Sequence, residues 1–198
     1  LREAMAANRI TKIRGILNGT CNDILSRMMR ENIAFDQALR AAQEAGYAEA
    51  DPSQDIDGID PAQKIALLAL LAFGKSVDPA TIPCTGIRGI THQHVAEARR
   101  DGLALKLIAT ATMIGGDIRL GVQPEKLPPH DPFAALDGPA NAIELHGDLV
   151  ETLTLIGPGA GGRATASAVI ADLVDIARGS RILPFGVPVV QLGQSCFR

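Results

Sequence analysis

The sequence predicts an α+β fold, in which a mixed, largely antiparallel sheet has helices packed on it. In the second half, pairs of apolar segments are separated by glycine turns, which is typical of antiparallel hairpins. In the first half, apolar residues recur at helical spacing. Helices and hairpins therefore fall into separate blocks instead of alternating as βαβ units, and this separation indicates the α+β class.

The composition narrows the possible functions. The chain has 198 residues, with 19 basic and 22 acidic side chains and a formal net charge of −3. Hydrophobic residues make up 46%, which is enough for a core and excludes a disordered chain. The balanced charge argues against nucleic-acid binding, and aromatic residues, at 3%, are too few for stacking platforms. The longest apolar run is about half the roughly 20 residues that cross a bilayer, so we expect no membrane contact.

The cysteines and the length suggest one domain from a reducing compartment. Cys21, Cys84 and Cys196 are far apart and odd in number, which favours reduced thiols in a cytoplasmic protein over a disulfide framework. The length suits a single domain over residues 1–198. Because the first residue is Leu1 and not Met, we expect this domain to be a piece of a longer chain.

The first half is expected to be mainly helical. In order, its elements are a helix end at 1–8, a strand at 10–17, a helix beginning at Thr20, a helix between Phe35 and Gly46, and a helix beginning at Asp60. Thr20 is the predicted cap of its helix, with Asp23 completing a partial capping box. Asp60 is the predicted N-cap of the last helix and Pro61 its first residue. The residues from Ile65 to Phe73 are apolar all round, so we expect that helix to be buried.

The second half is expected to contain two hairpins between two helices. The predicted elements are a polar helix capped by Thr91 and reaching Arg100, strands at 103–113, 117–123, 142–146 and 149–156, and an apolar helix at 165–178. Gly115-Gly116 and Gly147-Asp148 supply the two hairpin turns. The tail from Gly179 onward is rich in glycine and proline.

An acidic segment precedes the apolar helix and is followed by a lysine. Its carboxylates crowd into residues 49–60, as Glu49, Asp51, Asp55, Asp57 and Asp60. One interpretation is a solvated loop with Asp60 as a cap. The other is a reactive site, because Lys64 lies one turn after Asp60 at the rim of a core, where burial and nearby carboxylates act on its protonation in opposite directions. The carboxylates would then hold a substrate ammonium group. A Ca²⁺ or Mg²⁺ site is disfavoured because the spacing differs from that of an EF-hand loop.

A glycine-rich loop is the other candidate binding element. Gly157, Gly159 and Gly162 satisfy G-x-G-x-x-G between a predicted strand and a predicted helix. The hairpins before the loop are unlike a dinucleotide fold, so the loop is either a tight turn or a ligand contact at a helix N-terminus. The segment 18–20 is interpreted as a turn and cap that could also form a site wall. No zinc or hydrolase motif is present in the sequence, and we expect no metal ligands in it.

Three long blocks stand out in the sequence: GILNGTCNDIL at 15–25, GYAEADPSQDIDGIDPAQK at 46–64 and GPGAGGRATASAVIADLVDIAR at 157–178. Together with NAIELHGD and PFGVP, they resemble the homoserine dehydrogenase family. The match runs in order over essentially the whole chain, and its middle block is long and specific. Cys21 and Asp23 stand where threonine and an aromatic residue are more usual in that family.

The resemblance implies an oxidoreductase that interconverts L-homoserine and L-aspartate 4-semialdehyde by hydride transfer, on the route to threonine, methionine and isoleucine. It implies that Lys64 is the catalytic residue, which handles the hydroxyl proton. Glu49 and Asp60 would hold the substrate amino group, and Asp55 would be a further acidic residue of the substrate site.

The resemblance also implies a cofactor and a partner. Gly46, Gly159 and Gly161 would contact NAD(P), which the family holds mainly through an N-terminal domain outside this sequence. A monovalent-cation site would lie in that outside part too. We expect a homodimer and an isolated chain without activity. The alternative is a non-catalytic oligomerisation module, because the apolar strands of the second half could pair across a two-fold axis.

Overall fold

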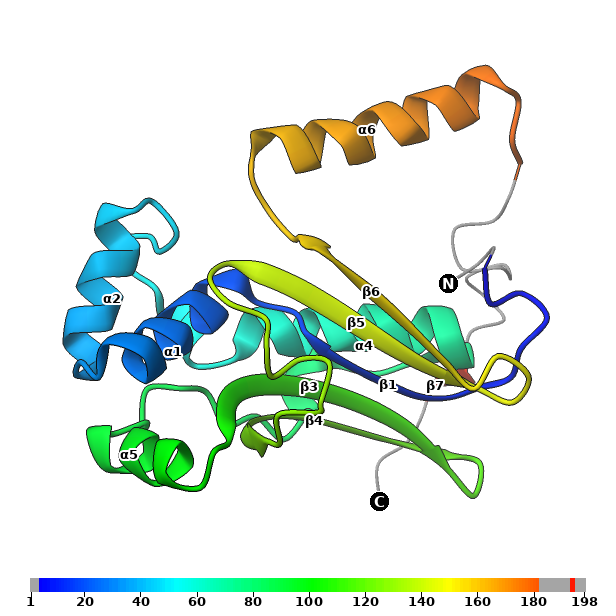
Figure 1. Cartoon of the computed structure of the whole chain (residues 1–198). Coiled ribbons are helices and arrows are strands. Elements are labelled where there is room, and N and C mark those ends of the chain that lie inside the picture. Colours follow the sequence, from blue (N-terminus) through cyan, green and yellow to red (C-terminus); the bar gives the residue numbers. More distant parts are fainter. Residues whose placement is uncertain (1–3, 182–192, 195–198) are drawn as a thin grey trace.

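A five-stranded antiparallel sheet forms the centre of the computed structural model, which describes residues 4–181 and 193–194 (Figure 1). The strands are β1 (Ile10–Ile16), β3 (Ala104–Ile114), β4 (Asp117–Leu127), β5 (Ala140–Gly147) and β6 (Thr152–Pro158). Their order in the sheet is β4-β3-β1-β5-β6, so the first strand of the chain lies in the middle. The predicted α+β class with a largely antiparallel sheet is confirmed.

The helices lie between and after these strands. They are α1 (Gly19–Glu31), α2 (Phe35–Glu44), α3 (Ser53–Ile56), α4 (Ile59–Phe73), α5 (His92–Arg100) and α6 (Gly162–Ala177), with a 3-10 turn at Pro79–Thr81. A two-residue parallel pair joins β2 (Lys75–Ser76) to β7 (Gly193–Gln194). Helices α1 and α4 both contact the sheet, and α2 and α5 contact α1.

The core lies mainly between the sheet and α1 and α4. Ile13 of β1 pairs with Ala111 of β3 and Leu145 of β5, and all three side chains are fully buried. They share one cluster with Ile24 of α1 and Ile65 of α4. Side chains alternate between the faces of a strand, so a second cluster lies on the opposite face. It is made of Ile16, Ile108, Leu127, Phe133 and Ala142.

Both predicted hairpins are present. Gly115 and Gly116 join β3 to β4 with φ angles of +60° and +93°, which glycine adopts without strain. The second hairpin joins β5 to β6. Strands β4 and β5 are longer than the sequence pattern predicted, whereas β6 runs from Thr152 to Pro158 where the pattern predicted residues 149–156. Residues 4–7 form a turn, where the sequence predicted a helix end.

The caps of two helices differ from prediction. Asn18, and not Thr20, caps α1, because its side chain accepts a hydrogen bond from the N–H of Cys21 at 2.8 Å. The Thr20 hydroxyl donates instead to the carbonyl of Tyr47 at 2.7 Å. Asp23 pairs with Arg27 at 2.7 Å and takes no part in a capping box.

The acidic segment is not a simple loop, because it contains the short helix α3. The following helix, α4, begins after Gly58, which has a φ of +82°, and Asp60 lies in its first turn. The carboxylate of Asp60 therefore does not cap α4, and it can form hydrogen bonds with other residues. The helix is also not wholly buried, since Leu67 is 56% exposed while Ile65 faces the core.

The predicted last helix is present as α6. It begins at Gly162, three residues before the predicted start, and Figure 1 shows it standing away from the sheet. Its apolar side chains are exposed, among them Ile170 at 57% and Leu173 at 58%. Within the described residues, no helix is long and apolar enough to cross a membrane. The PFGVP block and Cys196 lie outside the described residues.

Candidate active site

A polar pocket of about 380 Å³ lies where the starts of α1 and α4 meet the glycine loop after β6. Six of the seven residues predicted for the site line this pocket, although they come from distant parts of the sequence. They are Gly46, Asp55, Asp60, Lys64, Gly159 and Gly161. The fold therefore brings the acidic segment and the glycine loop to one place.

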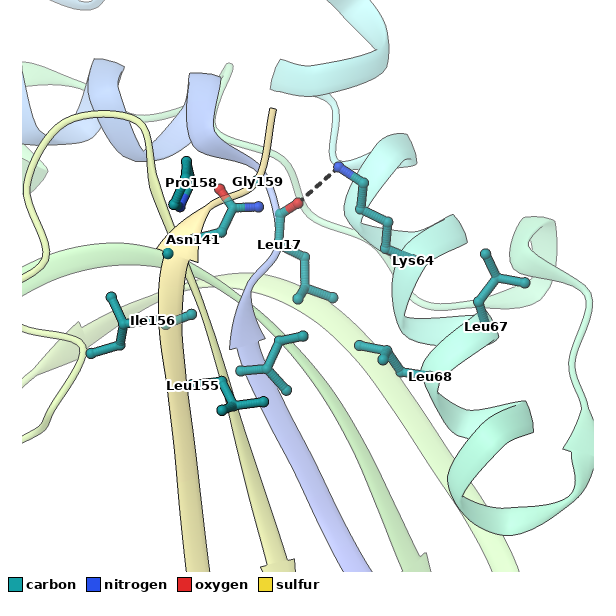
Figure 2. Close-up of a pocket in the computed structure, with 12 residues that line it drawn as sticks. Leu17, Lys64, Leu67, Leu68, Asn141, Leu155, Ile156, Pro158 and Gly159 are labelled. Atoms are coloured by element: carbon teal, nitrogen blue, oxygen red, sulfur yellow. Dashed lines mark hydrogen bonds between the residues drawn. The ribbon is translucent and has the colours of Figure 1, made fainter. Parts of the chain in front are cut away.

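The Lys64 amine points into this pocket from the second turn of α4. Its Nζ donates to Oδ2 of Asp60 at 2.8 Å and to the carbonyl oxygen of Leu17 at 3.0 Å. Figure 2 shows the second of these bonds, which joins α4 to the end of β1. The Lys64 side chain is 45% exposed, so its amine can also exchange protons with water. The predicted contact between Lys64 and Asp60, one turn apart, is therefore present.

Asn18 holds the two carboxylates of the pocket together. Its Nδ2 donates to Oδ1 of Asp55 at 2.6 Å and to Oδ2 of Asp60 at 2.8 Å. Its Oδ1 is used by the cap of α1, so the amide is fixed at both ends. Asn18 itself is buried. A short polar side chain between β1 and α1 thus sets the distance between α3 and α4.

The two carboxylates leave a place for a cation. Within the described chain, Oδ2 of Asp55 and Oδ1 of Asp60 have no hydrogen-bond donor. Asp55, Asp60 and Lys64 together carry one net negative charge when all three are ionised. An ammonium group that enters the pocket would both satisfy these oxygens and balance that charge.

Cys21 contacts the backbone of Asp55 beside the pocket, but its thiol is not reactive. Its Sγ lies 3.2 Å from the carbonyl oxygen of Asp55, to which the thiol donates. Burial, followed by the negative charge of Asp55, raises the pKa of the Cys21 thiol well above its ordinary value. The thiol therefore stays protonated and is not a nucleophile.

Glycines form the opposite wall of the pocket, because other atoms approach Gly159 and Gly19 closely and Gly161 has a positive φ. A Cβ on Gly159 would collide with the side-chain amide of Asn141. A Cβ on Gly19 would lie 2.6 Å from the carbonyl oxygen of Pro139. Gly161 precedes α6 with a φ of +104°. This wall presents backbone atoms to the pocket, so a flat ring could lie directly against it.

A second, mainly apolar pocket of about 520 Å³ adjoins the first (Figure 2). The two pockets share Lys64, Asn141, Pro158 and Gly159, and Leu17, Leu68, Leu155 and Ile156 are among the apolar residues of the second. Lys64 therefore lies between a charged compartment and an apolar one.

The family model described as homoserine dehydrogenase matches residues 1–174 of this sequence. The chain belongs to the homoserine dehydrogenase family. It is 40% identical over 182 residues to the homoserine dehydrogenase of Bacillus subtilis strain 168, and the alignment covers 92% of this chain and 42% of that protein.

Other members of the homoserine dehydrogenase family match over similar lengths. The crystal structure of a homoserine dehydrogenase from Thiobacillus denitrificans has a TM-score of 0.89 at 40% identity, covering 97% of this chain and 46% of that one. A protein of Pseudomonas canavaninivorans named NAD(+)-dependent homoserine dehydrogenase is 36% identical over 176 residues, covering 88% of this chain and 50% of that protein. The chain spans half or less of the length of these relatives.

The remaining carboxylates of the family's acidic block lie apart from the pocket. Glu49 is exposed and does not line the pocket in the described structure, so its role in substrate binding stays a prediction. Asp57 forms an ion pair with Arg88 at 2.7 Å, and this contact lowers the pKa of its carboxyl group. Asp51 accepts hydrogen bonds from Ser53 at the start of α3.

Two residues of the candidate site were missed or underrated from the sequence. Asn18 was interpreted as part of a turn that could form a site wall, and it proves to hold both carboxylates. Asn141 lines both pockets and was not singled out. Its buried Oδ1 has no hydrogen-bond partner in the part of the chain that the structure describes. The signal for Asn141 is its presence in a family block, and Asn18 has in addition the residue type of a helix cap. Within the same described part, no cluster of three or more His, Cys, Asp or Glu residues could hold a metal ion.

Proposed function

We propose that this chain is the catalytic and substrate-binding part of an NAD(P)-dependent homoserine dehydrogenase. The reaction is the interconversion of L-homoserine and L-aspartate 4-semialdehyde in amino-acid biosynthesis. One observation carries the proposal: the Lys64 amine and the two carboxylates held by Asn18 share a pocket with the glycine loop. A solvated acidic loop would not need this convergence.

The substrate ammonium group binds to Asp55 and Asp60 in this proposal. Each of these carboxylates has an oxygen without a donor in the described chain, and charge-assisted hydrogen bonds to an ammonium would fill both. Asn18 binds the other oxygen of each carboxylate and so keeps the two carboxylates at a fixed separation. The amino acid therefore enters in one orientation. The predicted contribution of Glu49 to the same ammonium group remains part of the proposal.

Lys64 handles the proton of the substrate hydroxyl. In the oxidising direction, the O–H bond breaks and the unprotonated amine of Lys64 takes the proton, while the hydride leaves the same carbon and an aldehyde forms. In the reducing direction, the Lys64 ammonium returns a proton to the developing alkoxide. Asp60 fixes the orientation of the amine, and the half-exposed side chain lets the proton exchange with water.

The glycine wall is the proposed contact for NAD(P), which supplies the hydride acceptor when bound. Gly46, Gly159 and Gly161 line the same pocket as Lys64, and at Gly46 and Gly161 the space where a Cβ would stand is open, so a cofactor ring could reach their backbone. Most of the cofactor would be bound by the part of the relatives that this chain does not span. A monovalent-cation site would also belong there.

We further propose that residues 1–198 form one domain of a cytoplasmic homodimer. Exposed apolar side chains on the second hairpin support self-association: Leu149, Val150, Leu155 and Ile156. The same surface supports the alternative of a non-catalytic oligomerisation module. Size-exclusion chromatography with light scattering measures the association, and a monomer at micromolar concentration would contradict both ideas.

The deciding experiment is Lys64→Ala in the full-length protein that contains this chain. We expect turnover of L-homoserine to fall about 100- to 10,000-fold, which is the usual contribution of a general acid–base group. Cofactor binding, followed by nucleotide fluorescence, should not change. Lys126→Ala is the matched control, since Lys126 lies on β4 and pairs with Glu97. Near-normal turnover of Lys64→Ala would overturn the assignment.

The isolated 198-residue chain separates the two candidate functions. We expect it to have no hydride-transfer activity, because the main cofactor-binding part is outside it. Measurable turnover by the isolated chain would contradict the proposal that hydride transfer needs a cofactor-binding part outside it.

A further inference from the structure

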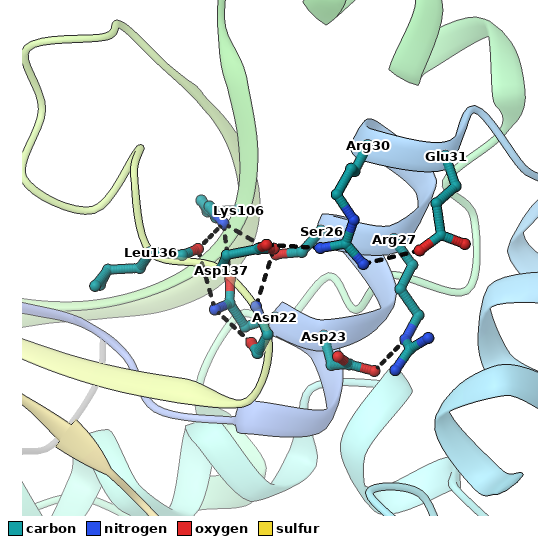
Figure 3. A network of polar contacts seen from close by, with 10 residues as sticks. Asn22, Asp23, Ser26, Arg27, Arg30, Glu31, Lys106, Leu136 and Asp137 are labelled. Carbon is teal, nitrogen blue, oxygen red and sulfur yellow. Dashed lines mark hydrogen bonds and ion pairs between the residues drawn. The ribbon is translucent and has the colours of Figure 1, made fainter. Parts of the chain in front are cut away.

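Lys106 of β3 is a buried amine outside the pocket described above. Its side chain is only 4% exposed. The Nζ donates to Oδ1 of Asn22 at 3.0 Å, to the hydroxyl of Ser26 at 3.3 Å and to the carbonyl of Leu136 (Figure 3). These acceptors are neutral, and among the described residues the amine forms no ion pair, although the negative charge of Asp137 raises its pKa against the effect of burial. All three of its N–H bonds are therefore used by α1 and by the segment before β5.

Asn22 is the central partner in this network. It is 1% exposed, and its Nδ2 lies 2.8 Å from the carbonyl oxygen of Gly138 and 3.3 Å from those of Leu136 and Ala140. Because an amide group has two N–H bonds, it shares them among these three acceptors. Its oxygen accepts from Lys106, so the lysine fixes which way the amide faces. Lys106 and Asn22 together thereby hold residues 136–140 against the first turns of α1 through hydrogen bonds.

The fastened segment continues directly into the polar pocket. Pro139 and Asn141 line that pocket together with Asp60 and Lys64. The start of α1 touches the same segment, since a Cβ on Gly19 would lie 2.6 Å from the carbonyl oxygen of Pro139. Any shift of residues 136–140 along α1 would therefore move one wall of the pocket relative to the other.

We propose that Lys106 is a positioning residue for the substrate pocket, acting through the amide of Asn22 on residues 136–140. This inference rests on the proposed function, because it assigns the pocket to an amino-acid substrate. Lys106 does not touch the pocket that Lys64 lines, so its effect is on geometry alone.

Stability alone does not explain a lysine at this position. Burial lowers the pKa of the Lys106 amine to about 8, which reflects how unfavourable the buried charge is. A methionine of similar length would fill the same space without that penalty, and replacing buried charges by apolar groups is often neutral or stabilising. What a methionine cannot supply is three donors to three acceptors from two different elements.

The test is Lys106→Met in the full-length protein, with steady-state kinetics and thermal melting. We expect kcat/KM for L-homoserine to fall about tenfold to a hundredfold, as for a misplaced binding wall, with most of the change in KM. The KM for the nicotinamide cofactor and the melting temperature should stay close to the wild-type values. Lys126→Met is the matched control and should leave every value unchanged.

Two results would overturn the inference. One is an unchanged kcat/KM in Lys106→Met. The other is a fall in kcat alone that follows a lower melting temperature, which would mean that Lys106 only stabilises the fold. Neither result affects the proposed function, which depends on Lys64→Ala and on the wild-type activity.

Asn22→Asp tests whether Lys106 acts on the pocket through Asn22. It also replaces Lys106→Met as the test if that variant does not fold. A carboxylate keeps a partner for Lys106 but has no N–H bonds for the carbonyls of residues 136–140. We expect the same rise in KM. In the double variant the two losses should not add, because both act through one contact. An unchanged KM in Asn22→Asp, or fully additive losses, would contradict positioning through Asn22.

Discussion

The side chain of Asn18 both caps a helix and bridges two carboxylates. Its Oδ1 caps α1, and its Nδ2 bridges two carboxylates that would otherwise repel each other. The carboxylates come from α3 and α4, so a single buried amide orders three helix starts around the pocket.

Replacement of Asn18 by alanine should therefore affect both stability and binding. Loss of a helix cap lowers the free energy of unfolding by about 1 kcal/mol. We expect in addition a rise in the KM for the amino-acid substrate, because Asp55 and Asp60 lose their common donor. Thr91→Ala is the control, since Thr91 caps α5 away from the pocket. It should lower stability to a similar degree and leave KM unchanged, and equal kinetic effects in both variants would contradict this role of Asn18.

The buried amine of Lys106 should also give stability a pH dependence. Its pKa in the folded chain is about 8, against an ordinary value of 10.5. Below about pH 8 the amine is charged in both states, and the penalty of burial, up to about 3 kcal/mol, is fully present. The penalty fades as the pH rises from about 8 to about 10.5, because the folded state releases its proton first.

Urea denaturation of the wild type and Lys106→Met measures this effect. The free energy of unfolding of the wild type, relative to the variant, should rise between about pH 7 and about pH 9.5. A difference that stays constant over this range would show that the amine has an ordinary pKa.

At the scale of elements, the start of α4 is the critical junction. Gly58 precedes the helix with a φ of +82°, and a Cβ there would lie 2.5 Å from Sγ of Cys84. Asp60 and Lys64 follow within the first two turns, so the position of this glycine controls the direction of both side chains.

Gly58→Ala should accordingly be more harmful than an ordinary glycine substitution. Strain and the clash with Cys84 act together, and we expect a loss of stability above about 1 kcal/mol together with a clear loss of turnover. Gly74→Ala is the matched control. It ends the same helix with a φ of +65°, but a Cβ there meets nothing within 4 Å. Equal losses of turnover in the two variants would contradict the role of the junction.

The elements show what the sequence pattern could and could not predict. The hairpin at Gly115-Gly116 was predictable, because local turn chemistry decides it. The cap of α1 was not predictable from local sequence, because Asn18 and Thr20 are both good cap residues and the contacts of Asn18 with Asp55 and Asp60 are distant in the sequence. The partners of Lys106 are distant in the sequence, and no local pattern predicts which buried acceptors will meet an inward lysine.

At the scale of the whole molecule, apolar surface is unevenly distributed. Exposed large apolar side chains gather on α6 and on the hairpin before it: Leu149, Val150, Leu155, Ile156, Val169, Ile170, Leu173, Val174 and Ile176. The apolar pattern of α6 predicted a helix correctly. That its side chains have no cover among the described residues depends on tertiary packing, which the pattern does not contain.

The stability of the isolated chain should be insensitive to this helix. Ile170→Gln with Leu173→Gln should shift the melting temperature by no more than about 2 °C, because both side chains are more than half exposed. Ile65→Ala is the comparison, since a fully buried isoleucine stabilises a fold by about 2–5 kcal/mol. A large loss from the glutamine pair, measured by thermal melting, would mean that α6 is covered in the isolated chain.

The central place of β1 in the sheet governs when the protein can fold during its synthesis. Arg14 of β1 pairs with Thr110 of β3 on one side and with Glu144 of β5 on the other, so β1 is fully paired only after both of these later strands have been made. Until β5 has left the ribosome, the nascent chain carries a strand with at least one bare edge, which is a template for wrong pairing. Closure of such distant contacts is slow. The order in which these strands are translated thus makes the growing polypeptide dependent on protection of the β1 segment.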